Sequence, residues 1–134
     1  MTKEFIYKFK IYYEDTDAGG VVYYANYLKF FERARSEAIY SLGFSNTDLR
    51  NKFNIMFIVK SCNIEYKKPA KFEDSLVINS VLTSLTKTSF IMKQIIKRDE
   101  ELITHANVHL VSVDKNGKPT KIPKEINLVL EKNI

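Results

Sequence analysis

The chain has 134 residues, enough for one ordinary domain and too few for two, so we predict a single domain over residues 1–134. Apolar residues make up 45% and charged residues 28%, which excludes a disordered or fibrous chain, and no apolar run reaches the ~18 residues of a membrane span. The net charge of +5 comes from scattered lysines, 17 against 4 arginines, so we expect no nucleic-acid partner.

The N-terminal residues alternate between charged and apolar side chains. They contain no apolar core of a secretory signal, so we expect a cytoplasmic protein. Residues 5–13, FIYKFKIYY, predict a strand, because alternate residues are apolar and fall on one face. That face carries Phe5, Tyr7, Phe9, Ile11 and Tyr13.

The apolar spacing changes at Tyr27 from a strand period to a helical period. We expect Asn26 to cap this helix and Gly43 to stop it. It is the only long helix that the sequence predicts, so the strands have to pack around it. The apolar residues of its predicted buried face are Tyr27, Phe30, Phe31, Ala34, Ala38 and Leu42.

Four strand-like runs follow a polar stretch at residues 45–54, and their short connections predict antiparallel hairpins. Pro123 is expected at the first position of a short terminal helix. One long helix with about five antiparallel strands predicts an α+β fold in which a curved sheet wraps around the helix. Apolar residues on both strand faces also indicate a subunit interface. The four runs span residues 55–66, 75–85, 89–97 and 102–113.

The acidic turn EDTDAGG, residues 14–20, is the most unusual local feature of the chain. A carboxylate such as Asp17, held just before a helix, can act as a general base while free backbone N–H groups polarise a carbonyl oxygen. The same residues also fit an ordinary solvated turn, and spacing alone favours that interpretation. They do not form a calcium loop, because Gly19 has no side-chain oxygen at position 5 and Asn26 cannot supply the bidentate carboxylate at position 12.

Histidine and cysteine residues give no sign of a metal site or a catalytic triad. His105 and His109 share one face of an expected strand and lie about 13 Å apart, too far to bind one metal ion. Cys62 alternates within another expected strand and is assigned to packing. No GxSxG motif presents a nucleophilic serine. We therefore expect no metal and no separate cofactor.

Residues 12–35, YYEDTDAGGVVYYANYLKFFERAR, strongly resemble the signature of the hotdog-fold acyl-CoA thioesterases of the YbgC and 4-hydroxybenzoyl-CoA thioesterase group. Residues 65–76, EYKKPAKFEDSL, resemble a second segment of that family, Y-x-x-P-A-x-x-x-D-x-L. The order of elements fits the family over nearly the whole chain. The resemblance implies hydrolysis of an acyl-CoA thioester in a hotdog fold, with coenzyme A as part of the substrate. It changes the interpretation of the acidic turn from an ordinary turn to an active site.

The resemblance also implies roles for individual residues. The family's catalytic carboxylate corresponds to Asp17, and the backbone N–H that polarises the thioester carbonyl corresponds to Tyr24. Tyr24 stands where many YbgC-type proteins have histidine, although the 4-hydroxybenzoyl-CoA branch also has tyrosine there. Lys87 lies in a turn that resembles a phosphate-contacting turn of that branch, and Gly20 and Tyr27 are the other expected substrate-binding residues.

Two other functions stay open at this point. A hotdog hydratase or dehydratase is expected to carry a histidine shortly after its aspartate, where this chain has Val22. A non-catalytic sensor of acyl-CoA or acyl carrier protein, or an envelope-associated scaffold, is the second alternative. The resemblance further implies a homodimer or homotetramer with active sites at subunit boundaries, and it makes acyl carrier protein a further candidate partner.

Overall fold

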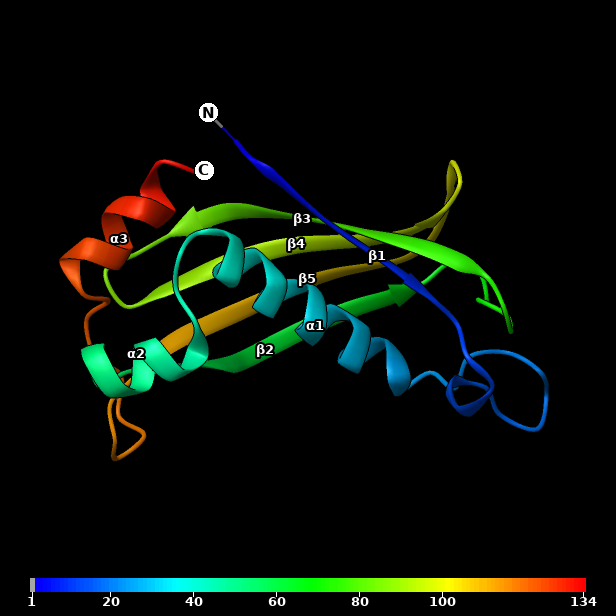
Figure 1. Ribbon diagram of the computed structural model, residues 1–134, viewed down its shortest axis with the longest axis horizontal. Coiled ribbons are helices and arrows are strands. Elements are labelled where there is room, and N and C mark those ends of the chain that lie inside the picture. The colour runs from blue at the N-terminus through cyan, green and yellow to red at the C-terminus, as the bar shows by residue number, and fades with distance from the viewer. Residues whose placement is uncertain (1) are drawn as a thin grey trace.

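One long helix crosses one face of a five-stranded antiparallel sheet in the computed structural model, which describes residues 2–134 (Figure 1). This arrangement confirms the expected α+β hotdog fold. The helices are α1 (Asn26–Ser41), α2 (Asn46–Phe53) and α3 (Lys124–Glu131), with a short 3-10 turn, η1, at Tyr13–Asp15. The strands are β1 (Glu4–Lys10), β2 (Met56–Tyr66), β3 (Ser75–Leu85), β4 (Ser89–Arg98) and β5 (Glu101–Val113).

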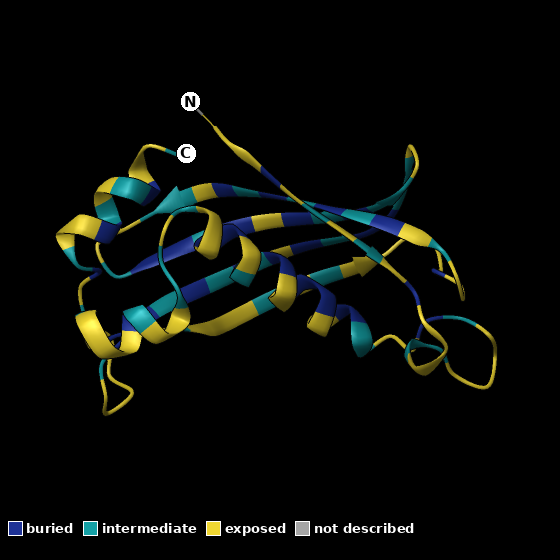
Figure 2. Cartoon of the chain, in the orientation of Figure 1, coloured by how far each residue is buried: buried dark blue, intermediate teal, exposed yellow. Residues whose placement is uncertain are grey.

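The strand order is β1-β3-β4-β5-β2, so β1 and β2 form the two edges of the sheet. Cross-strand partners share a face, and the register therefore collects an apolar row from each strand beneath α1. Phe90 lies opposite Leu110 and Met92 lies opposite Val108, and all four are buried. Figure 2 shows buried and exposed residues alternating along α1, as the helical period predicts. Its buried residues are Tyr27, Phe30, Phe31, Ala34, Ala38 and Ile39.

The edge strand β2 is less covered than the central strands. The axis of α1 runs close to β1 and β3, and Figure 2 shows most of β2 exposed to solvent. Met56, Ile58 and Val59 are large apolar residues that remain exposed on this strand. An edge strand with unpaired backbone groups and exposed apolar side chains is a surface that another chain can cover.

The helix ends follow local signals only in part. α1 is followed by Gly43, whose φ of +97° lies in the left-handed region, as expected for a glycine stop. Asn26, expected to cap α1, is instead its first residue, and its side chain donates to the Asp15 carbonyl oxygen at 2.9 Å. Pro123, expected inside α3, is its N-cap residue. No helix within residues 2–134 is long and apolar enough to cross a membrane.

The polar stretch at residues 45–54 forms α2, which the apolar periodicity did not predict. Ser45 Oγ accepts a hydrogen bond from the Asp48 N–H at 2.9 Å, and the Asp48 carboxylate accepts one from the Ser45 N–H at 3.2 Å. This reciprocal capping pair satisfies donors that the helix start would otherwise leave unpaired. A capping signal rather than an apolar stripe therefore marks α2.

The strand expected over residues 5–13 ends earlier, at Lys10. The Tyr12 N–H donates to the Asp15 carboxylate at 2.9 Å, and this bond bends the chain into η1 instead of prolonging the strand. Tyr13, expected on the buried face, is consequently 79% exposed.

Candidate active site

The candidate catalytic loop, residues 15–23, folds back on itself as a tight antiparallel ribbon. The Asp17 N–H donates to the Val21 carbonyl oxygen at 2.9 Å, and the Tyr23 N–H donates to the Asp15 carbonyl oxygen at 3.0 Å. Gly20 closes the turn, because its N–H donates to the Asp17 carbonyl oxygen at 3.0 Å and its φ of +80° favours glycine. These bonds define one conformation of the loop without help from a ligand.

A second segment anchors this loop to the sheet. The Val22 N–H donates to the Ala70 carbonyl oxygen at 2.8 Å. The turn that contains Ala70 is itself held by Arg98, whose guanidinium donates to the Asp74 carboxylate at 2.6 Å. Hydrogen bonds to charged groups are the stronger ones, so this turn is a firm support. The two sequence segments that carry the family resemblance therefore meet in space at the catalytic loop.

The Asp17 side chain is exposed, and one of its oxygens is held in place. The Gly19 N–H donates to Asp17 Oδ1 at 2.8 Å, whereas Oδ2 accepts no hydrogen bond from residues 2–134. A Cβ at position 19 would lie 3.2 Å from Oδ1, closer than ordinary van der Waals contact. Asp17 opens into a cavity of about 440 Å³ that is also lined by Tyr13 and Phe72. The loop thus presents one free carboxylate oxygen beside an open, partly aromatic space.

The start of α1 supplies a free backbone donor. Tyr24 lies just before the N-cap residue of α1, and its N–H donates to no acceptor within residues 2–134. Free N–H groups at a helix start carry a partial positive charge and can polarise a carbonyl oxygen. Because the neighbouring Tyr23 belongs to the ribbon, the loop that presents Asp17 leads directly into this donor.

Tyrosine rings surround this donor. The Tyr24 and Tyr66 rings meet edge-on with centroids 6.4 Å apart, and the Tyr66 and Tyr27 rings are 5.3 Å apart. The Tyr66 hydroxyl also donates to the Tyr24 carbonyl oxygen at 3.4 Å. Sequence reasoning did not select Tyr66 as a site residue, although it opens the Y-x-x-P-A segment. Its place as the last residue of β2 brings it to the helix start.

Tyr27, expected to bind substrate, is only 3% exposed. Its hydroxyl oxygen accepts a hydrogen bond from the Ala70 N–H at 3.2 Å, and burial raises the pKa of Tyr27. The residue therefore joins α1 to the turn that supports the catalytic loop, and it lies beneath the site.

Lys87 lies in the turn between β3 and β4, at the opposite end of the sheet from Asp17 (Figure 1). β3 begins beside the catalytic loop, where the Asp74 carbonyl oxygen accepts a hydrogen bond from the Ile11 N–H at 2.9 Å. The strand then runs for 11 residues, which is roughly 35 Å, before it reaches the turn. Within one chain Asp17 and Gly20 lie in the ribbon of residues 15–23 and Tyr24 directly follows it, whereas Lys87 lies at the other end of the sheet.

Metal-ligating side chains do not gather in the part of the chain that the structure describes. Among residues 2–134, no group of three histidine, cysteine, aspartate or glutamate residues is placed to hold a metal ion. His105 and His109 are partly buried on β5, the strand expected to carry them.

Comparisons with known proteins show which family the chain resembles. The sequence profile of the thioesterase superfamily matches residues 19–104. The acyl-CoA thioesterase YbgC of Haemophilus influenzae is 37% identical over 123 residues, which cover 91% of this chain and 90% of the relative. The acyl-CoA thioester hydrolase YbgC of Escherichia coli is 40% identical over 127 residues, which cover 93% of this chain and 94% of the relative.

A solved structure extends the likeness to three dimensions. The probable thioesterase from Bartonella henselae superimposes with a TM-score of 0.87 at 34% identity, covering 90% of this chain and 100% of that chain. Sequence and fold therefore agree over nearly the whole length, and the chain belongs to the thioesterase superfamily.

Proposed function

We propose that this chain hydrolyses acyl-CoA thioesters, with Asp17 as the reacting carboxylate and the Tyr24 N–H as the donor to the thioester carbonyl. The proposal rests mainly on the ribbon of residues 15–23, which presents a singly hydrogen-bonded, exposed carboxylate just ahead of a free backbone N–H. Relatives named as acyl-CoA thioesterases, at 37% and 40% identity over most of the chain, support this class of reaction.

Two routes use these groups. In the first, Asp17 removes a proton from water, the hydroxide adds to the carbonyl carbon, and the C–S bond breaks to release the acid and a coenzyme A thiolate, which then takes up a proton. In the second, Asp17 Oδ2 attacks the carbonyl carbon and expels the thiolate, and water then cleaves the resulting anhydride. In both routes the Tyr24 N–H stabilises the negative charge that grows on the carbonyl oxygen.

The alternatives fit the same site less well. Val22, at the position where a hotdog hydratase or dehydratase is expected to have histidine, is 5% exposed and its N–H is bonded to Ala70. A sensor or an envelope-associated scaffold has no need for a carboxylate oriented by Gly19. Acyl carrier protein remains a candidate carrier of the acyl group, since the same thioester bond would be cleaved. The one thiol, Cys62, is unpaired, which accords with the cytoplasmic location that we also propose.

We further propose that the working form is a homodimer or homotetramer in which two copies pair along β2. Antiparallel pairing about a two-fold axis brings the Met56 end of one strand beside the Tyr66 end of the other. The turn that carries Lys87 lies at the Met56 end of the sheet (Figure 1). Such pairing would bring Lys87 of a second copy toward Asp17, where a positive charge favours the phosphates of coenzyme A.

The reaction is tested by the release of free thiol from a panel of acyl-CoAs, measured with a chromogenic thiol reagent. A thioesterase releases thiol and loses this activity in Asp17→Asn, a hydratase adds water to an enoyl-CoA without releasing thiol, and a sensor binds without turnover. No thiol release from any acyl-CoA or acyl carrier protein would reject the proposed reaction. A mass of about 15.6 kDa by light scattering at micromolar concentration would reject the proposed assembly.

A further inference from the structure

A second polar centre lies beneath the middle of α1, away from the catalytic loop. Arg35 extends from α1 toward the sheet, and its Nη1 donates to Gln94 Oε1 at 3.0 Å. Gln94 is fully buried on β4, and its Nε2 donates to the Phe31 carbonyl oxygen at 3.1 Å and to Ser80 Oγ at 2.9 Å. Because Gln94 is bonded on both its oxygen and its nitrogen, it holds the guanidinium in one place.

Arg35 forms no ion pair in the part of the chain that the structure describes, although the negative charge of Glu32 favours its protonated form. Glu32, one turn earlier on α1, accepts a hydrogen bond from the Ser36 hydroxyl at 3.2 Å and remains exposed. Burial lowers the pKa of Arg35, because a partly buried cation is poorly solvated. The bond to Gln94 uses one of the five N–H donors of this guanidinium, so most of them are available to an anionic oxygen.

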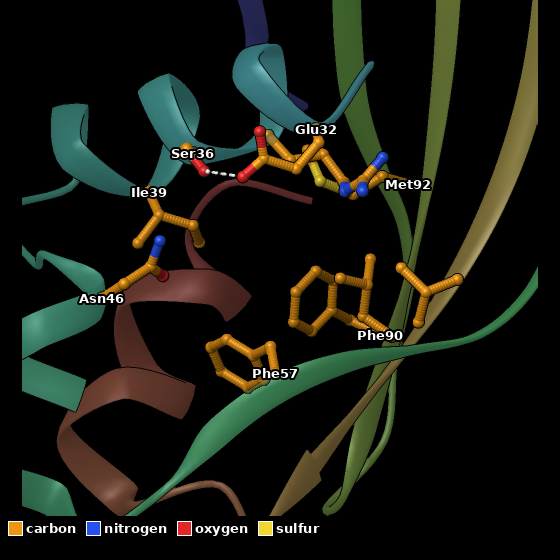
Figure 3. Close-up of a pocket in the computed structure, with 10 residues that line it drawn as sticks. Glu32, Ser36, Ile39, Asn46, Phe57, Phe90 and Met92 are labelled. Carbon is orange, nitrogen blue, oxygen red and sulfur yellow. Dashed lines mark hydrogen bonds between the residues drawn. The ribbon is translucent and has the colours of Figure 1, made fainter. Parts of the chain in front are cut away.

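Arg35 lines a cavity of about 160 Å³ between α1, the start of α2 and the sheet (Figure 3). Figure 3 shows the Phe57 and Phe90 rings on one side of this space and Ile39 of α1 facing them. Glu32, Ser36 and Asn46 also line the cavity, and Arg35 is the one cation among its lining residues. Apolar walls beside one inward cation suit an apolar chain that ends in a carboxylate. Its apolar walls are Ile39, Phe57, Val59, Phe90, Met92 and Leu110.

An apolar strip leads from this cavity to the catalytic loop. The strip consists of three residues of β2, Cys62, Ile64 and Tyr66. Each of them pairs with a buried residue of β5 that lies beneath α1. At 1.5 Å per residue, Arg35 lies about 16 Å along the helix from Tyr24. An extended polypeptide spans about 3.3–3.6 Å per residue, which is about 1.2 Å for each of its three backbone bonds. An extended acyl chain at the same rise per bond needs about 12–14 carbons to span this distance.

We propose that Arg35 selects acyl-CoA substrates whose acyl chain ends in a second carboxylate. This inference rests on the proposed thioesterase function and defines its substrate class. With the thioester carbonyl at the Tyr24 N–H, the methylene groups lie along the strip and the terminal carboxylate accepts hydrogen bonds from Arg35. An unsubstituted chain of equal length covers the guanidinium without pairing with it, and this raises its free energy of binding.

The test compares the mono-CoA ester of tetradecanedioic acid with tetradecanoyl-CoA in the full-length wild type and in Arg35→Met. The readout is the ratio of the two kcat/KM values, because general damage to the fold affects both substrates and divides out. We expect the wild type to prefer the dicarboxylic substrate by about ten- to a hundredfold, the size of a hydrogen bond to a charged group. Arg35→Met should lower the ratio by the same factor, and Arg35→Lys should retain part of it.

Lys29→Met removes an exposed cation from the same helix and is the matched control, with an unchanged ratio. If Arg35→Met does not fold, Arg35→Gln, which retains a donor for Gln94, replaces it. A wild-type ratio near one, or a ratio that the Arg35 variants leave unchanged, overturns the inference even when Asp17→Asn abolishes thiol release. If the wild type releases thiol from neither compound, the proposed function is decided by the wider panel of acyl-CoAs, and calorimetric binding of both compounds to the same variants decides the inference. Equal affinities overturn it.

Discussion

Gly19→Ala is the most selective perturbation of the catalytic loop, because it acts on one oxygen of Asp17. The Gly19 N–H donates to Asp17 Oδ1 at 2.8 Å, and an added Cβ would lie 3.2 Å from that oxygen. Gly19 has no positive φ, so alanine causes no backbone strain there. The carboxylate has to give way by a few tenths of an ångström, and its free oxygen moves with it.

The size of the effect follows from this displacement. A misplacement of about 1 Å at a reacting group costs about 10²-fold in rate, so a few tenths of an ångström predict a loss of roughly three- to thirtyfold in kcat. KM should stay within about twofold, because the substrate is still bound by its other contacts. Alanine also restricts the unfolded chain, so stability should be unchanged or should rise by at most about 1 kcal/mol.

The assay measures kcat and KM from thiol release and the midpoint of thermal unfolding on the same preparation. Gly117→Ala is the matched control, because Gly117 has a φ of +77° with no atom within 4 Å of an added Cβ. That variant should lose about 1–2 kcal/mol through backbone strain and lower the midpoint by about 3–8 °C, with kcat unchanged. A Gly19→Ala protein with wild-type kcat, or with kcat reduced only in proportion to a lower midpoint, would refute the assignment of Gly19 as a residue that positions Asp17.

Three further perturbations test the charges. Asp17→Asn keeps the shape of the side chain but removes the ionised oxygen, so kcat should fall by roughly 10²–10⁴ with substrate still bound. Glu14→Gln is the control and should lower kcat much less. A near-normal kcat in folded Asp17→Asn contradicts both routes. Lys87→Glu should raise KM for acyl-CoA more at low than at high salt, and an unchanged KM at low salt removes Lys87 from the site. The hydrogen bond from Lys68 lowers the pKa of Glu101 in the folded protein. Ionised Glu101 therefore stabilises the folded state above its ordinary pKa of 4.5, and this stabilisation is lost as the pH falls through the lowered pKa. The difference in melting midpoint between wild type and Glu101→Gln should therefore shrink below pH 4.5, and a pH-independent difference argues against this pair.

Apolar periodicity was enough to predict α1 and all five strands, because each of these elements buries a regular stripe of side chains. It did not predict α2, whose one buried residue, Leu49, leaves no stripe to detect. The only local signal for α2 was the Ser45–Asp48 capping pair. The end of β1 was also hidden, since the apolar alternation continues to Tyr13 while the Asp15 carboxylate turns the chain.

Residue spacing alone favoured an ordinary turn at residues 14–20, and the family resemblance selected Asp17 and Tyr24 as candidate site residues. Asp17, Gly19 and Tyr24 lie within a few positions of one another, so their relation depends on local hydrogen bonds that consecutive residues make. Tyr66 was missed, because its contact with Tyr24 spans 42 positions and requires β2 to end beside α1.

The remaining features depended on how the helix packs on the sheet. Lys87 follows a strand whose length carries it to the far end of the molecule, a separation that sequence order does not reveal. Arg35 and Gln94, 59 positions apart, become partners only when α1 lies across β4. Local hydrogen bonds and apolar periods are written into short stretches of sequence, whereas contacts between distant residues exist only after elements have packed, because packing alone decides which faces meet.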